Sequence, residues 1–264
     1  MSATARPRRA ALATVLCAAT LALGATACGP FPDLGSGSAS GSGADKPKAT
    51  GPFAELTGPE VADKAMTATK SAKSLSLDLD LKTSDGPMKA YVSTGRQGRC
   101  AGTMTIGATG TAEFVHPAGQ AVYMRLDKAF LKEQTKGESP DVRRKVIRKL
   151  MGRWIKTGAK SPDAKGMLDL CDLKSLLSDF EGPYTGLKKG KETTVDGQKA
   201  LPLTDSDGGE KIAIYVATEG TPYVLRIVTT GGKEPGTMTF SHYDEPVEAK
   251  APPKKDVLDE KSLG

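Results

Sequence analysis

The sequence predicts an exported α+β domain built on one curved antiparallel sheet of about ten or eleven strands, covered by helices. Three observations predict it. A charged and then apolar N-terminus is typical of a secretory signal. Short segments with a two-residue apolar period alternate with turn sequences in two runs. Helical segments precede the first run and separate it from the second, so they can cover the apolar face of the sheet.

The N-terminus has the layout of an export signal. Three arginines lie within the first nine residues, and the run 10–24 carries no charge and is too short to span a membrane. The small residues Ala25 and Ala27 suit a signal peptidase. Residues 1–27 are therefore predicted to be a signal peptide.

Cys28 follows the cleavage site and admits two interpretations. Residues 21–28 resemble a bacterial lipobox, in which the cysteine sulfur receives a diacylglycerol before cleavage. Alternatively, residues 25–27 form an ordinary A-x-A site and the protein is simply secreted. Of the four cysteines, Cys17 leaves with the signal, so acylation of Cys28 would leave an even pair. This count favours lipidation.

Residues 28–57 are predicted to be the lipidated cysteine and a flexible tether, since residues 35–43 contain only Gly, Ser and Ala. A run of about 30 such residues reaches roughly 30 Å. A tether would give an anchored domain clearance from the bilayer, whereas a disordered terminus is the alternative. The folded domain is expected over residues 58–248, followed by a loose, charged and Pro-containing tail, residues 249–264.

The basic isoelectric point, near 9.0, does not indicate a nucleic-acid partner. Three of the 37 basic residues lie in the signal, so 34 basic and 31 acidic residues remain after cleavage. Aromatic residues make up only 5% of the chain, too few for base-stacking platforms. We therefore expect no nucleic-acid binding.

The first predicted elements are one helix and a five-stranded meander. Thr57 and Glu60 have capping-box spacing, and Pro59 suits a first turn, which predicts a helix over residues 59–72. Leucines at every second position of the segment 75–81 then give the clearest strand signal in the chain. Short turns separate it from four further predicted strands, at residues 88–96, 100–106, 111–116 and 120–126.

The middle of the chain is predicted to be helical, over residues 127–136, 139–153 and 161–180. The second of these helices has a basic face opposite its apolar face, formed by Arg143, Arg144, Lys145, Arg148 and Lys149. This face could contact anionic lipid. The alternative, which the sequence favours, is an ordinary solvated face.

Strands resume in the second half, at residues 198–203, 211–217, 223–230 and 236–243, separated by Asp- and Gly-containing turns; residues 193–195 could add another. The residues 195–203, 214–226 and 240–247 give this half a resemblance to LppX/LprG-type lipoproteins of actinobacteria, which share the LolA/LolB-like fold. The resemblance implies an open antiparallel half-barrel closed by helices around a hydrophobic cavity. Members of this group carry or present lipids and lipoglycans outside the cytoplasmic membrane.

The candidate lining of such a cavity consists of apolar residues on the predicted strands. They are Leu75, Leu77, Leu79, Met104, Ile106, Phe114, Val122 and Met124. Each acyl methylene buried against them would gain about 0.8 kcal/mol. The same alternation fits a filled core, and only the resemblance favours a cavity.

Cys100 and Cys171 are expected to form a disulfide, because an oxidising compartment makes this the usual state of paired cysteines. The bridge would join a predicted strand to the third helical segment. The alternative is two separately buried thiols.

Catalytic and metal-binding patterns are not evident. His116 and His242 lie in predicted strands without a nucleophile motif, and Asp78 and Asp80 share a solvated strand face. The sequence contains no CxxC, HExxH or G-x-S-x-G motif. We therefore expect a non-catalytic protein without a metal or other cofactor.

Together these features predict a lipoprotein on the outer face of the cytoplasmic membrane that binds a lipid or lipoglycan. The alternative is a tethered protein-interaction or envelope-sensor module on the same scaffold. The sequence does not specify the oligomeric state, and we expect a monomer.

Overall fold

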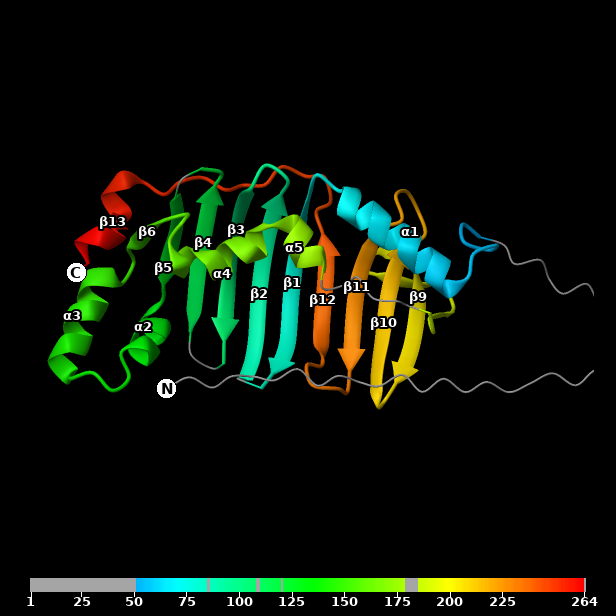
Figure 1. Ribbon diagram of the computed structural model, residues 1–264, viewed down its shortest axis with the longest axis horizontal. Helices are drawn as coiled ribbons and strands as arrows, with labels where there is room; N and C mark the ends of the chain where they lie inside the picture. The colour runs from blue at the N-terminus through cyan, green and yellow to red at the C-terminus, as the bar shows by residue number, and fades with distance from the viewer. Residues whose placement is uncertain (1–50, 85, 108–109, 120, 179–184, 264) are drawn as a thin grey trace, which may run out of the picture. The chain divides into compact units, whose positions relative to one another are not determined.

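The computed structural model describes residues 51–263 except 85, 108–109, 120 and 179–184 (Figure 1). The predicted signal peptide, Cys28 and the predicted tether as far as residue 50 lie outside the described residues. Lys48–Gly264 form one compact unit, which combines helices with a single large β-sheet.

The first run of strands is the predicted antiparallel meander. It comprises β1 (Ser74–Thr83), β2 (Gly86–Gly95), β3 (Arg99–Ile106), β4 (Thr111–Pro117) and β5 (Ala121–Leu126). Each strand pairs with the next. The short strand β6 (Trp154–Gly158) extends this run beside β5, and the sequence did not predict it because five residues are too few to show alternation.

The second run joins the first to make one sheet. It comprises β7 (Lys188–Lys189), β8 (Thr193–Val195), β9 (Gln198–Asp207), β10 (Glu210–Ala217), β11 (Val224–Thr230) and β12 (Gly236–Ser241). Because β12 pairs with β1, the strand order is β13-β6-β5-β4-β3-β2-β1-β12-β11-β10-β9-β7, with β8 beside β9.

The predicted fold class is confirmed: the domain is α+β, with a large, unclosed and mostly antiparallel sheet. The described residues form thirteen strands where ten or eleven were expected, because β6, β7 and β13 are only two to five residues long and show no alternation in the sequence. Only the pairing of β13 with β6 is parallel among the described strands.

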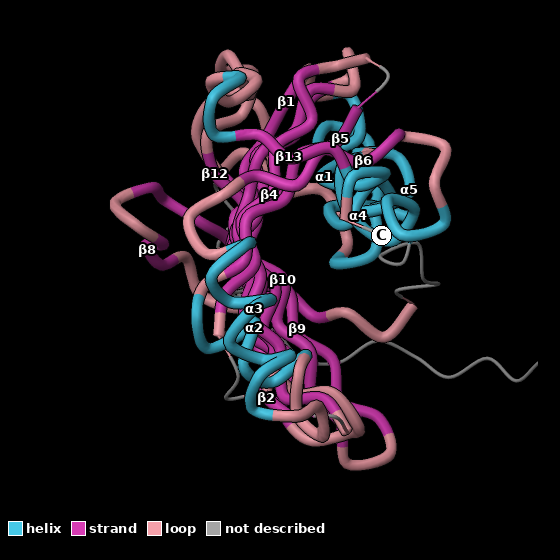
Figure 2. The backbone as a smooth tube through the Cα atoms, turned by 90° about the vertical axis from the view of Figure 1, so that its left-hand side faces the viewer, coloured by secondary structure: helices cyan, strands magenta, loops and turns pink. Residues whose placement is uncertain are grey.

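Three helices cover one face of the sheet (Figures 1 and 2): α1 (Gly58–Ser71), α4 (Pro162–Cys171) and α5 (Leu173–Ser178). We call this the inner face; it carries Leu75, Leu77 and Leu79, which pack with all three helices in the main core. β6 and β7 lie toward opposite ends of the sheet, so the chain between them must cross it. The segment α4–α5 makes that crossing over the inner face.

The start of α1 has the predicted capping box. The Thr57 backbone N–H donates to Glu60 Oε2 at 2.7 Å, and the Glu60 N–H donates to Thr57 Oγ1 at 3.4 Å. The helix buries Val61, Ala62 and Ala65 against the sheet. The small side chains let helix and strands approach closely.

Two shorter helices, α2 (Lys128–Gln134) and α3 (Pro140–Leu150), adjoin the end of the sheet near β5 and β6 (Figure 1). They cover a second small core formed by Ala112, Leu126, Leu131 and Ile155. The predicted third helix is interrupted at Asp172, which separates α4 from α5. Among the described residues, no helix is long and apolar enough to cross a membrane.

The structure differs from the expected layout at both ends of the domain. Phe53, which the sequence assigned to the tether, is buried in the main core, and Lys189 Nζ donates to its carbonyl at 2.9 Å. The expected loose tail forms the 3₁₀ turns η1 (Lys254–Asp256) and η2 (Glu260–Ser262) around β13 (Val257–Asp259). This short strand pairs with the edge of β6, whose backbone groups would otherwise lack partners in the sheet.

Candidate functional site

Most of the predicted cavity residues lie in a filled core. Five of the eight are buried between sheet and helices: Leu75, Leu77, Leu79, Phe114 and Val122. Met104 and Met124 are half-buried against the same core, and the side chain of Ile106 lies outside the described part of the structure. A role of these residues in lining a ligand cavity stays a prediction.

Half-buried apolar side chains on β1, β2, β3, β10 and β12 pack against the main core. We call this set the methionine belt; it consists of Leu81, Met88, Met104, Ile212 and Met238. The strand register places Leu81 opposite Met88, and it places Met238 opposite the buried Leu79. Methionine side chains are flexible and adapt to varied apolar partners.

A pocket of about 570 Å³ opens between the α4–α5 segment and the adjacent ends of β2 and β3. We call it the rim pocket. Small or apolar groups on its wall are Gly95, Gly98, Leu168, Cys171, Leu173 and Leu177. Polar groups on its wall are Lys70, Arg96, His116, Asp172 and Lys174. None of the seven predicted cavity residues whose side chains the structure describes lines it.

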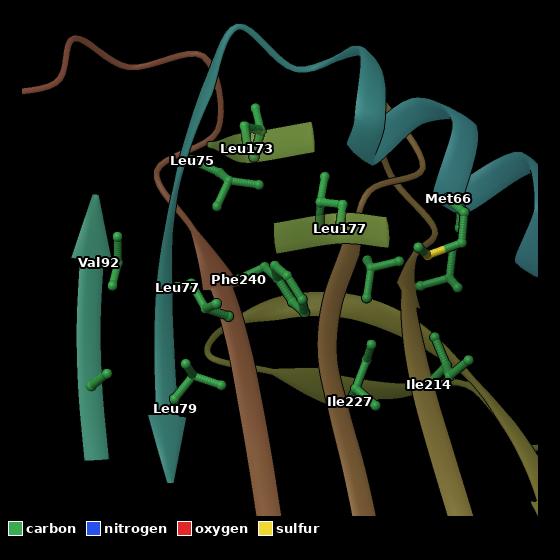
Figure 3. Packing of buried hydrophobic residues seen from close by; sticks show 14 of the residues in the cluster. Met66, Leu75, Leu77, Leu79, Val92, Leu173, Leu177, Ile214, Ile227 and Phe240 are labelled. Carbon is green, nitrogen blue, oxygen red and sulfur yellow. The ribbon is translucent and has the colours of Figure 1, made fainter. Parts of the chain in front are cut away.

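The apolar floor of the rim pocket comes from the helices that cross the sheet. Leu173 and Leu177 of α5 are buried and reach from the helix toward the sheet, where Leu75 and Phe240 lie (Figure 3). Leu168 of α4 is half-buried and borders the open space. A ligand in the pocket would therefore contact an aliphatic surface that is continuous with the main core.

Two links hold the α4–α5 segment beside the pocket. Cys100 of β3 and Cys171 at the end of α4 form a disulfide, the pairing expected from the sequence, with their Cα atoms 5.3 Å apart. In addition, the buried Thr94 Oγ1 donates to the Cys171 carbonyl oxygen at 2.5 Å. Because the disulfide and the hydrogen bond meet at one residue of the segment, this wall of the pocket is fixed to β2 and β3.

The edge of the pocket is basic. Arg96 donates from Nε to the Ala72 carbonyl at 2.9 Å and from Nη2 to the Lys70 carbonyl at 2.7 Å, so its guanidinium caps the C-terminus of α1. These bonds hold one positive charge at the pocket edge, where Lys70 and Lys174 add two more. Such an arrangement favours an anionic group.

Asp172 is the acidic member of the rim. Its carboxylate accepts from the Ser175 hydroxyl at 2.8 Å and from the Lys174 backbone N–H at 3.0 Å. These hydrogen bonds, led by that of Ser175, hold the pKa of Asp172 below its ordinary value of 3.8. The ionised carboxylate thus fixes the start of α5 and offsets part of the positive charge.

Of the histidines and aspartates singled out from the sequence, His116 alone lines the rim pocket. His116 lines the pocket, but its Nδ1 lies 3.0 Å from the Ala121 carbonyl oxygen, whereas His242 pairs with Glu245 at 2.9 Å. Asp78 and Asp80 are both exposed, and Asp80 pairs with Lys89 at 2.8 Å. Within the described ranges, no three His, Cys, Asp or Glu side chains are placed to hold a metal ion.

Sequence reasoning missed the rim pocket because its residues lie on turns and helix ends, which carry no periodic signal. One indirect signal existed. The predicted disulfide joins positions 100 and 171, so it also brings the turn 96–98 close to residues 172–174. The basic residues beside each cysteine could therefore have been identified from the sequence as neighbours in one site.

No protein-family model and no curated protein matches this sequence. Among solved structures, LprF from Mycobacterium bovis is similar, with 12% identity over 74% of this chain and 96% of LprF, at a TM-score of 0.44. Lipoprotein LppX from Mycobacterium tuberculosis has 14% identity over 73% of this chain and 98% of LppX, at a TM-score of 0.46. Both are mycobacterial lipoproteins of the type that the sequence resembles. The MucA/MucB complex of Pseudomonas aeruginosa is more distant, with 11% identity over 74% of this chain and 61% of the matched chain, at a TM-score of 0.33.

Proposed function

We propose that this protein is a membrane-anchored lipoprotein of the outer face of the cytoplasmic membrane that binds a lipid or lipoglycan without catalysis. The rim pocket is the observation that carries the proposal. Its volume of about 570 Å³ lies within the range of roughly 300–1,000 Å³ that is usual for small-molecule sites. Its aliphatic floor and basic edge match the two parts of an anionic or hydroxyl-bearing lipid.

In the proposed mechanism, the pocket shields the acyl chain of the lipid from water. Methylene groups would lie against Leu168, Leu173 and Leu177, and each buried methylene would contribute about 0.8 kcal/mol. The head group would remain at the pocket edge, where Arg96 and Lys174 can donate hydrogen bonds. No covalent bond is made or broken.

Anchoring through Cys28, which is part of the proposal, would serve this function, because the tether would hold the pocket near the bilayer that supplies the lipid. A run of 23 residues, from position 28 to position 50, precedes the described structure. Fully extended, it would span about 80 Å. The anchored domain could therefore sample the membrane surface without dissociating from it.

Native mass spectrometry tests the proposal directly. Residues 29–264 are purified without detergent from a lipid-containing host, and we expect a co-purifying mass that extracts into organic solvent as an acyl lipid. Leu168→Trp should abolish this mass, because the indole fills the pocket. The matched variant Leu176→Trp should retain it, because Leu176 packs on the core but does not line the pocket. A bare protein mass that is unchanged after incubation with phospholipid vesicles would contradict the carrier function.

The methionine belt favours a second candidate function. Its half-buried residues could contact a protein partner in a tethered interaction or envelope-sensor module, since methionines suit adaptable binding surfaces. Two results together would support this alternative. The protein would carry no lipid, and its binding to a partner would be lost in the double variant Met88→Ser with Met238→Ser but kept in Leu168→Trp.

A further inference from the structure

The positive charge of the protein is concentrated in one segment. Residues 127–153, which include α2 and α3, contain nine basic and four acidic residues, a net charge of +5. The chain after residue 27 has 34 basic and 31 acidic residues, a net charge of +3. The rest of that chain is therefore slightly acidic, and the basic character belongs to one end of the sheet.

Helix α3 packs against the rest of the domain through one side only. None of its residues, all of which the structure describes, is buried. Ile147 and Leu150 pack against the second core, which positions the opposite side of the helix toward solvent. A helix held in this way can contact a further surface without rearranging the domain.

The outward side of α3 is basic. Arg144, Lys145, Arg148 and Lys149 are exposed, and because the second pair follows the first by four residues, the two pairs lie on neighbouring turns of one helix surface. Arg144 forms an ion pair with Asp141, and Lys149 Nζ lies 3.3 Å from the Ser262 carbonyl oxygen. Within the described part of the chain, Lys145 and Arg148 have no ion-pair partner.

Exposed apolar side chains flank this basic surface. Among the described residues, the large hydrophobic side chains that are exposed are Tyr91, Val142 and Met151, at 42%, 41% and 51%. Val142 lies in the first turn of α3 and Met151 is its C-cap residue. Basic residues next to exposed apolar ones are typical of helices that lie in the interface of a membrane.

We infer that the outward side of α3 contacts the surface of a bilayer that contains anionic lipid, in addition to the Cys28 anchor. This inference rests on the anchoring part of the proposed function. Lys145 and Arg148 supply the charge complementarity, and Val142 and Met151 enter the head-group region.

The spacing of the two attachment points permits this contact. α3 adjoins the β5–β6 end of the sheet, whereas α1, which follows the tether, packs near β10 and β11. Eight strand intervals separate β6 from β10 in the sheet order, which corresponds to about 38 Å. The extended tether spans about twice that distance, so anchoring at Cys28 leaves α3 free to reach the same bilayer.

The test is vesicle flotation of residues 29–264, which retain the whole compact unit Lys48–Gly264. We expect binding to phosphatidylcholine vesicles that contain phosphatidylglycerol, weaker binding to phosphatidylcholine alone, and a decrease with added salt. Lys145→Gln with Arg148→Gln should weaken binding to the anionic vesicles about twenty-fivefold, because each basic residue near the surface contributes about fivefold. The control Lys211→Gln with Lys233→Gln removes the same charge from exposed sites on β10 and the β11–β12 turn, and should change binding less than threefold.

Two results would overturn the inference: no binding to anionic vesicles, or equal losses in the two double variants. Thermal unfolding shows that each variant is folded, and Leu168→Trp should bind vesicles like the unmodified protein. The cargo test is independent. A protein that carries lipid but does not bind vesicles contradicts this inference alone, whereas a lipid-free protein that binds them through α3 contradicts only the carrier function.

Discussion

The carboxylate of Asp172 affects both the local structure of the rim pocket and its charge. Asp172 follows the disulfide-bonded Cys171, so the attachment to β3 also fixes its position. Its two hydrogen bonds start α5 and direct Leu173 into the pocket floor. The same carboxylate lies among the basic residues of the pocket edge, where it would oppose an anionic head group.

Asp172→Asn separates these two effects. Asparagine keeps an oxygen acceptor at the start of the helix, so we expect a loss of about 1 kcal/mol in the free energy of unfolding at neutral pH. Because the folded-state pKa of Asp172 is lowered, the carboxylate contributes stability above its unfolded-state pKa near 3.8 and loses it as the pH falls through the folded-state pKa. The difference in the free energy of unfolding between the unmodified protein and Asp172→Asn should therefore be constant above about pH 5 and shrink below pH 4.

Urea unfolding at a series of pH values measures this difference. Ser175→Ala removes the leading hydrogen bond and should reproduce part of the loss with the same pH dependence. A difference between Asp172→Asn and the unmodified protein that is independent of pH down to pH 2 would show that the charge of Asp172 does not stabilise the fold.

Elements whose apolar residues recur at a regular spacing could be predicted from the sequence, and elements that form only through long-range strand pairing could not. In β1 the leucines alternate with polar residues because one face of the strand is buried and the other faces solvent. The meander could be predicted because short turns join its strands. β6, β7 and β13 have two to five residues each, and they form strands only because a neighbouring edge pairs with them. Their sequences alone contain no such information.

The candidate site was less predictable than the fold. Alternation identified inward-facing residues such as Leu77 and Phe114, but an inward position is the same in a filled core and in a cavity wall. The rim pocket instead combines the end of α1, the β2–β3 turn and the α4–α5 junction. At the level of sequence, the disulfide relates only the last two of these segments.

The C-terminal element offers a direct test of tertiary pairing. Deletion of residues 254–264 removes η1 and β13, which should expose the edge of β6 and the side chain of Trp154, now only 7% exposed. Trp154 is the only tryptophan of the chain, so its fluorescence emission should shift to longer wavelength. We expect the free energy of unfolding to fall by about 2 kcal/mol, because half-buried apolar side chains of the tail are lost. Deletion of residues 263–264 alone keeps β13 and should leave the emission unchanged; an unchanged emission in the longer deletion would mean that the tail is not bound to β6.

At the scale of the whole molecule, the buried side chains of the sheet and of the helices pack against one another in one main core. Val61 and Ala65 of α1 and Leu177 of α5 are buried against Leu77 and Ile214 of the sheet. The rim pocket lies at the margin of this core and does not interrupt it. Lipid is therefore expected to add stability to a domain that already folds, in contrast to a carrier whose sheet and helices separate when empty.

Calorimetry of delipidated protein tests this expectation. The empty protein should unfold in one cooperative transition, and lipid at about 100 times its Kd should stabilise it by about 2.7 kcal/mol. For a domain of this size, that stabilisation corresponds to a rise in Tm of about 5–10 °C. Leu168→Trp should unfold cooperatively but show no rise, because the pocket is filled. An empty protein without a cooperative transition would show that the core depends on its ligand, and the buried leucines would then be part of the cavity wall.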